Sequence, residues 1–113
     1  MTTLTEQKLQ AHLAGVRPFS FADGTFRGNI PHIVCADGTR LSMQASLSHY
    51  CTPRDDKGPW REVEVGFPSR ELTGLMAWAE EPDEPTETVY GYVPLSVLAD
   101  IVDSCGGLME PAP

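Results

Sequence analysis

The most regular alternation of apolar and acidic residues lies in the stretch 60–67, where Val63, Val65 and Phe67 alternate with Glu62 and Glu64. A spacing of two residues is typical of a β-strand with one buried face. We therefore expect a central strand at 60–67, with all three apolar side chains directed into the core. The segment 46–59 before it is rich in Pro, Gly and Asp, which indicates a loop.

A β-hairpin is predicted around the dipeptide Asp37-Gly38. Apolar residues fill 33–35 before this dipeptide and recur at alternate positions in 41–45 after it. Asp-Gly is favoured in two-residue hairpin loops because both residues tolerate a positive φ. The motif occurs once more at Ala22–Thr25, where we expect a short hairpin or an ordered turn.

Two helices are predicted in the first 80 residues. Thr3 followed by Glu6 fits a capping box, which begins a short helix over 4–14. Its apolar face is narrow, so we expect it at the periphery of the fold. Ser69 is the predicted N-cap of a second helix, whose apolar residues recur at helical spacing through 72–79.

The C-terminal part contains a strand followed by a helix. Residues 88–93 are rich in β-branched and aromatic residues, and Gly91 within them indicates a bulge or a close backbone approach. The last helix is predicted to begin at Pro94, a favourable first helical residue, and to end at the glycines 106–107. Residues 108–113 are expected to form a loose tail.

The order of these elements predicts the α+β class. We expect a mainly antiparallel sheet of three to five strands, with two or three helices packed on one face. The chain of 113 residues, 41% of them hydrophobic, is expected to fold as a single domain over 1–113, with a peripheral N-terminal helix in 1–15. No apolar run approaches the ~20 residues that span a bilayer, and the N-terminus does not resemble a secretion signal. A cytoplasmic protein is therefore expected.

Charge is distributed unevenly along the chain. The formal net charge is −8, yet the residues through Arg70 contain seven acids and eight bases. From Glu71 to the C-terminus there are nine acids and no lysine or arginine. Such a segment repels nucleic acid and membranes and favours a basic protein partner.

A partner-binding surface is predicted in and near the acidic segment Glu80–Glu87, with aromatic residues as anchors. The expected residues are Glu80, Glu81, Asp83, Glu84, Glu87, Tyr90, Tyr92 and Trp60. Tyr90 and Tyr92, two residues apart, are expected to share one face of their strand. The alternative interpretation is that the acidic segment only maintains solubility.

An enzyme or ligand-binding protein is the alternative hypothesis, with a pocket beside the loop 49–61. Its residues would be His49, Cys51, Arg54 and Arg61. An activated thiol also needs an oriented base and an oxyanion pocket. The neighbouring sequence has no Gly-rich segment or helix N-terminus that could form an oxyanion pocket. We therefore favour a protein without enzymatic activity.

No metal or cofactor is predicted. His32, Cys35, His49 and Cys51 have the composition of a Cys₂His₂ zinc site. However, residues three apart on a strand point to opposite faces, which separates His32 from Cys35. Cys35 is instead expected in the core, where free cysteines are common.

Four segments, VCADGTRLSMQAS, HYCTPRDDKGPW, VEVGFPS and VYGYVP, occur in this order between residues 33 and 107. In this part the chain resembles small proteins of unassigned function encoded by bacteriophages and prophages. The resemblance implies an accessory phage protein in the bacterial host cytoplasm that binds a basic host protein. A nucleic-acid-binding defence complex is one such partner, which would make the protein an anti-CRISPR or other anti-defence inhibitor. A phage assembly component that forms a homo-oligomer is a further alternative.

Overall fold

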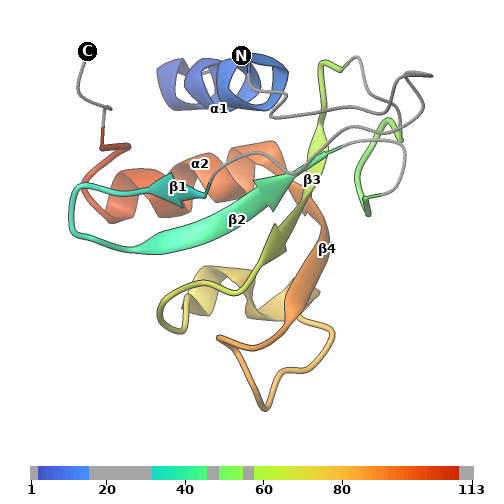
Figure 1. Ribbon diagram of the computed structural model, residues 1–113, viewed down its shortest axis with the longest axis vertical. Helices are drawn as coiled ribbons and strands as arrows, with labels where there is room; N and C mark the ends of the chain where they lie inside the picture. The colour runs from blue at the N-terminus through green and yellow to red at the C-terminus, as the bar shows by residue number, and fades with distance from the viewer. Residues whose placement is uncertain (1–2, 16–31, 46–48, 55–57, 110–113) are drawn as a thin grey trace, which may run out of the picture.

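A four-stranded antiparallel sheet with strand order β1-β2-β3-β4 organises the protein (Figure 1). The computed structural model describes residues 3–15, 32–45, 49–54 and 58–109. The elements within them are α1 (Leu4–Gly15), β1 (Ile33–Val34), β2 (Arg40–Gln44), β3 (Glu62–Gly66), the 3₁₀ helix η1 (Thr73–Trp78), β4 (Val89–Pro94) and α2 (Leu95–Ser104). The predicted α+β class is confirmed.

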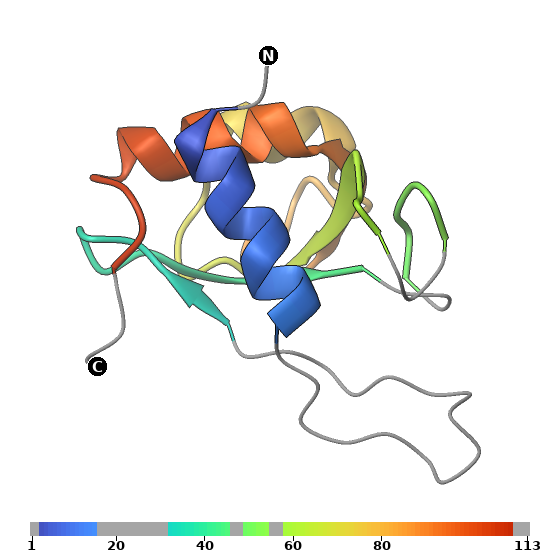
Figure 2. The same cartoon turned by 90° about the horizontal axis from the view of Figure 1, so that it is seen from above.

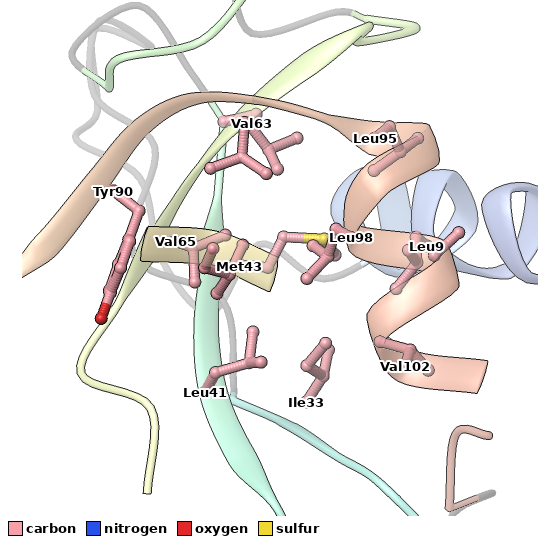
Figure 3. Packing of buried hydrophobic residues seen from close by; sticks show 14 of the residues in the cluster. Leu9, Ile33, Leu41, Met43, Val63, Val65, Tyr90, Leu95, Leu98 and Val102 are labelled. Carbon is pink, nitrogen blue, oxygen red and sulfur yellow. The ribbon is translucent and has the colours of Figure 1, made fainter. Parts of the chain in front are cut away.

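One hydrophobic core lies between the sheet and the helices (Figure 3). Leu41 and Met43 of β2 and Val63 and Val65 of β3 are completely buried, as is Leu98 of α2. This confirms that β3 is an interior strand with one buried face. Burial of an aliphatic side chain contributes roughly 1.5–3 kcal/mol, so this layer provides much of the stabilisation of the fold.

Helix α1 packs against α2 and contributes two leucines to this core. One half of the predicted capping box is present, since the Glu6 N–H donates to the Thr3 hydroxyl at 3.1 Å. Leu9 and Leu13 are completely buried, and Figure 2 shows α1 crossing α2. The Thr5 hydroxyl also donates to an Asp103 carboxylate oxygen of α2 at 2.6 Å. Two leucines four residues apart are therefore enough to dock a short helix.

The predicted β1–β2 hairpin is confirmed, but its loop has three residues. The Cys35 N–H donates to the Thr39 oxygen at 2.8 Å, and the Gly38 N–H donates to the Cys35 oxygen at 2.9 Å. Gly38 has a φ of 94°, the left-handed conformation that a three-residue hairpin loop places at its last position. The earlier copy of the motif at Ala22–Thr25 lies outside the described residues.

Strand β3 ends at Gly66, before the last residue of the predicted pattern. Phe67 has a φ of 48°, its N–H donates to the Thr88 oxygen at 3.0 Å, and its side chain is 54% exposed. The expectation that Phe67 would lie in the core is therefore wrong. A positive φ breaks the alternation of faces on which the pattern depends.

The predicted helix after Ser69 is shorter and is a 3₁₀ helix, η1. Ser69 does not cap it, because its hydroxyl accepts the Arg40 N–H at 2.9 Å and its N–H donates to the Arg40 oxygen at 2.8 Å. This side-chain contact across the sheet competes with the predicted local cap. Leu72 stands at the N-cap position without a side-chain hydrogen bond, and Leu75 is buried.

Helix α2 follows its prediction closely. Pro94 was predicted as the first helical residue, and it is the N-cap, the residue immediately before the helix. Gly106 and Gly107 end it with φ values of 92° and 88°, and the Gly107 N–H donates to the Val102 oxygen at 2.9 Å. These contacts satisfy carbonyl groups of the last turn.

The beginning of the expected tail is paired with β1. Leu108 forms an antiparallel bridge with Cys35, and the Met109 N–H donates to the Val34 oxygen at 2.8 Å. These contacts cover part of the edge of β1, so 108–109 do not form a loose tail. Residues 110–113 lie outside the described residues.

Candidate functional site

A β-bulge in β4 shapes the outer face of the sheet. One residue of β3, Glu64, stands opposite two residues of β4, Gly91 and Tyr92. Tyr92 has a φ of 57°, and the two tyrosines of β4 consequently point to opposite sides. Tyr90 is completely buried, whereas Tyr92 is 42% exposed. The predicted bulge is confirmed, and the prediction that Tyr90 and Tyr92 share a face is wrong.

The loop 49–54 approaches the sheet at this bulge, and Gly91 makes room for it. A Cβ atom at Gly91 would lie 3.2 Å from the Cβ of Tyr50. The Tyr92 N–H donates to the Tyr50 oxygen at 3.0 Å, and the Tyr50 N–H donates to a Glu64 carboxylate oxygen at 3.1 Å. Tyr50 is thus held in place from both β3 and β4.

These contacts create an exposed aromatic pair, Tyr50–Tyr92. The two ring centroids are 5.9 Å apart, and the ring planes are inclined by 31°. The guanidinium carbon of Arg54 lies 5.9 Å from the Tyr50 centroid, within the range of a cation–π contact. Tyr50 was absent from the predicted site. Gly91 indicated a close backbone approach, but it did not identify Tyr50 as the neighbour.

The acidic loop 80–87 is attached to β4 at its two ends. The Glu80 N–H donates to the Val89 oxygen at 3.0 Å, and the Glu81 N–H donates to the Thr88 hydroxyl at 3.0 Å. The Tyr90 hydroxyl donates to the Pro85 oxygen from the core side. The loop therefore has a defined backbone path beside the strand.

Two turns within the loop arrange its acidic residues. The Glu84 N–H donates to the Glu81 oxygen at 2.9 Å, and the Glu87 N–H donates to the Glu84 oxygen at 2.9 Å. The five predicted acidic residues of the loop are all exposed: Glu80, Glu81, Asp83, Glu84 and Glu87. Within the described part of the chain none of them forms an ion pair. The loop therefore presents uncompensated negative charge.

Two predicted anchors, Trp60 and Tyr90, are core residues and cannot provide an exposed contact. Trp60 is 1% exposed, its N–H donates to the Gln10 side-chain oxygen at 3.1 Å, and its own oxygen accepts from the Gln10 amide group. Burial raises the pKa of Tyr90, and the negative charge of Glu71 raises it further. Tyr90 remains neutral and acts as a support for the acidic loop.

Among the described residues, the cavity that Arg61 lines is not shared by the other alternative site residues, His49, Cys51 and Arg54. Cys51 is 1% exposed, and its thiol donates to the Pro53 oxygen at 3.3 Å. His49 is half-buried, and Arg54 lies over the ring of Tyr50. Arg61 lines a cavity of about 390 Å³ between α1 and the start of α2, and the other three residues do not. This arrangement provides no accessible thiol next to a base.

Among the described residues, there is no group of three or more His, Cys, Asp or Glu side chains that could hold a metal ion. His32 is exposed, whereas Cys35 is 1% exposed, as expected for a core cysteine. In the described ranges, no helix has the length and apolarity needed to cross a membrane.

The chain matches no protein-family model, no curated protein and no solved structure.

Proposed function

We propose that this is a non-enzymatic binding protein whose acidic loop 80–87 engages a basic surface of a partner protein. The observation that carries this proposal is the loop itself. Its carboxylates are exposed and lack ion-pair partners among the described residues, while its backbone is attached to β4.

The attachment matters for the free energy of binding. Ordering a flexible segment at an interface costs conformational free energy, and a loop already held in one path avoids much of that cost. Negative charge of one sign also accelerates the encounter with a basic partner. Salt screens this attraction over about 8 Å at physiological ionic strength, so binding is expected to weaken as salt increases.

The exposed aromatic pair Tyr50–Tyr92 supplies the anchors that Trp60 and Tyr90 do not. Tyr92 lies on β4, the strand that begins immediately after the acidic loop. Tyrosine provides a large contact area with few rotatable bonds, and it is enriched in interfaces. We include Tyr50 and Tyr92 in the proposed partner-binding surface.

The resemblance to phage-encoded proteins supports a bacterial host protein as the partner. A nucleic-acid-binding defence complex has a basic surface of the required kind, and the acidic loop would occupy it in place of nucleic acid. The protein would then be an anti-defence inhibitor, for example an anti-CRISPR protein. The partner is sought by capture from bacterial lysate at low and high salt, followed by mass spectrometry.

Neutralising three loop acids should weaken binding of an arginine-rich peptide used as the first probe. The loop variant is Glu81→Gln/Glu84→Gln/Glu87→Gln. The control variant Glu6→Gln/Glu71→Gln/Asp100→Asn changes the net charge equally at other positions. Exposed ion pairs contribute up to about 1 kcal/mol each, so the loop variant should bind roughly tenfold more weakly, with a smaller salt dependence.

Fluorescence anisotropy at several salt concentrations provides this measurement, and the captured partner is tested in the same way. The control variant should bind nearly as well as the unmodified protein. Equal weakening by both variants would show that net charge alone controls binding and would contradict the proposal.

A further inference from the structure

Two buried thiols, Cys35 and Cys105, meet where the β1–β2 hairpin packs against the end of α2. Both cysteines are free, and their side chains are 1% and 2% exposed. Cys105 is near enough to Cys35 to raise the pKa of its thiol. The function proposed above does not use either thiol.

Backbone contacts hold the two segments together independently of the thiols. The Asp37 N–H donates to the Cys105 oxygen at 3.1 Å, and the Ala36 N–H donates to the Gly107 oxygen at 2.8 Å. A Cβ atom at Gly106 would lie 3.0 Å from the Cβ of Ala36, so the hairpin and the end of α2 are in close contact. The proximity of the cysteines is therefore built into the fold.

Arg70 connects this thiol pair with the surface. Its Nη2 donates to the Cys105 sulfur at 3.1 Å, and its Nε donates to the Thr39 hydroxyl at 3.0 Å. Nη2 also lies 3.5 Å from an Asp37 carboxylate oxygen, and the Arg70 side chain is 53% exposed. A cationic donor at sulfur stabilises negative charge that develops there during reaction.

The two thiols are not equivalent. The pKa of Cys35 is raised to about 11, mainly by burial, with smaller contributions from Cys105 and Asp37 and an opposing effect of Arg70. Cys35 is therefore a protonated thiol at neutral pH. Cys105, in contact with the guanidinium group, is the better placed of the two to react first.

We propose that Cys35 and Cys105 form an oxidation site at which a hydroperoxide converts the two thiols into an intramolecular disulfide. The Cys105 sulfur attacks a peroxide oxygen, gives up its proton and displaces hydroxide, which gives a sulfenic acid and water. The sulfur of Cys35 then attacks the Cys105 sulfur, loses its proton and releases water. In total, two thiols lose two protons and two electrons, and hydrogen peroxide is reduced to two water molecules.

The disulfide would join the hairpin covalently to the end of α2, two segments that are distant in the sequence. Closing so long a loop restricts the unfolded chain, which stabilises the folded state. The oxidised protein should melt roughly 10 °C above the reduced protein.

The full-length chain is treated with hydrogen peroxide under native conditions and analysed by mass spectrometry without reduction. The expected product has lost the mass of two hydrogen atoms, contains one cross-linked peptide pair with Cys35 and Cys105, and reverts with dithiothreitol. Cys51→Ser should still form the product, because Cys51 bonds with Pro53 in a different loop. Cys35→Ser should not form it.

Arg70→Ala should slow formation of the cross-link several-fold, whereas Arg40→Ala, at another exposed arginine, should not. Three outcomes would overturn the proposal in the natively folded, unmodified chain. They are a cross-link that involves Cys51, conversion of Cys105 to sulfinic or sulfonic acid without a cross-link, and thiols that remain reduced until the protein unfolds.

Discussion

Burial determines the chemical state of single residues in this protein. Cys35 and Tyr90 both carry weakly acidic groups whose pKa values are raised mainly by burial. Each is therefore neutral at physiological pH, Cys35 as a core thiol and Tyr90 as a donor to the acidic loop. The exposed carboxylates of that loop, in contrast, carry charge that is available to a partner.

Cys35 should make the stability of the reduced protein depend on alkaline pH. A cysteine ionises at pH 9.0 in the unfolded chain, but the pKa of Cys35 is about 11 in the folded protein. Because the folded value is raised, this contribution is fully present below pH 9 and is lost as pH rises towards 11. The loss should be about 2 kcal/mol, measured as the free energy of unfolding in urea.

The variant Cys35→Ala should show a smaller decrease over the same pH range. Tyr90 acts in the same direction above pH 10.0, so Tyr90→Phe serves to subtract its contribution. An unchanged pH dependence in Cys35→Ala would contradict this assignment.

At the scale of elements, the bulge in β4 links three parts of the structure. It turns Tyr92 outwards, leaves Tyr90 in the core, and places Gly91 where the side chain of Tyr50 needs space. A regular strand would have put both tyrosines on one side and left no place for the loop 49–54.

The variant Gly91→Ala should disturb this junction. Its Cβ would lie 3.2 Å from the Cβ of Tyr50, so Tyr50 must move, and the protein should lose about 1 kcal/mol of stability. The matched control is Gly66→Ala in β3, whose Cβ would lie 3.7 Å from the nearest atom of Val89. The control should be neutral or slightly stabilising, because alanine also reduces the entropy of the unfolded chain.

Urea denaturation measures both variants, and NMR shifts of Tyr50 and Tyr92 report on the aromatic pair. Equal stability of the two alanine variants, with unchanged tyrosine signals in Gly91→Ala, would show that Gly91 is not needed to accommodate Tyr50.

At the scale of the whole molecule, helix α1 completes the core from the side of α2. The apolar face of α1 is narrow, yet its residues Leu9 and Leu13 are completely buried. Gln10 adds hydrogen bonds to the backbone of Trp60. The N-terminal helix therefore connects α2 with the segment that leads into β3.

The variant Leu9→Ala should lose about 2–4 kcal/mol of stability, because truncation of a buried leucine leaves a cavity. Leu4→Ala on the same helix is the control, since Leu4 is 66% exposed and its truncation should change stability by about 0.5 kcal/mol at most. Thermal unfolding followed by circular dichroism compares them. A Leu9→Ala protein as stable as the control would mean that α1 is not docked in solution.

The sequence predicted those elements whose signals lie within a few neighbouring residues. The alternation at Val63 and Val65, the turn at Asp37-Gly38 and the glycines after α2 all act through local backbone geometry. The acidic character of the C-terminal third is likewise a property of composition. These features do not depend on which distant segments are in contact.

Only the tertiary structure decided which side chains are exposed and which segments support the acidic loop. Trp60 and Tyr90 are buried, Tyr50 joins Tyr92, and Ser69 contacts Arg40 instead of capping a helix. Each outcome depends on contacts between residues far apart in the sequence, and similar local patterns are compatible with several such contacts. The centre of β3, Glu62–Gly66, could thus be located from its pattern alone, whereas the end of the strand and the surface beside it depend on packing against the loop and β4.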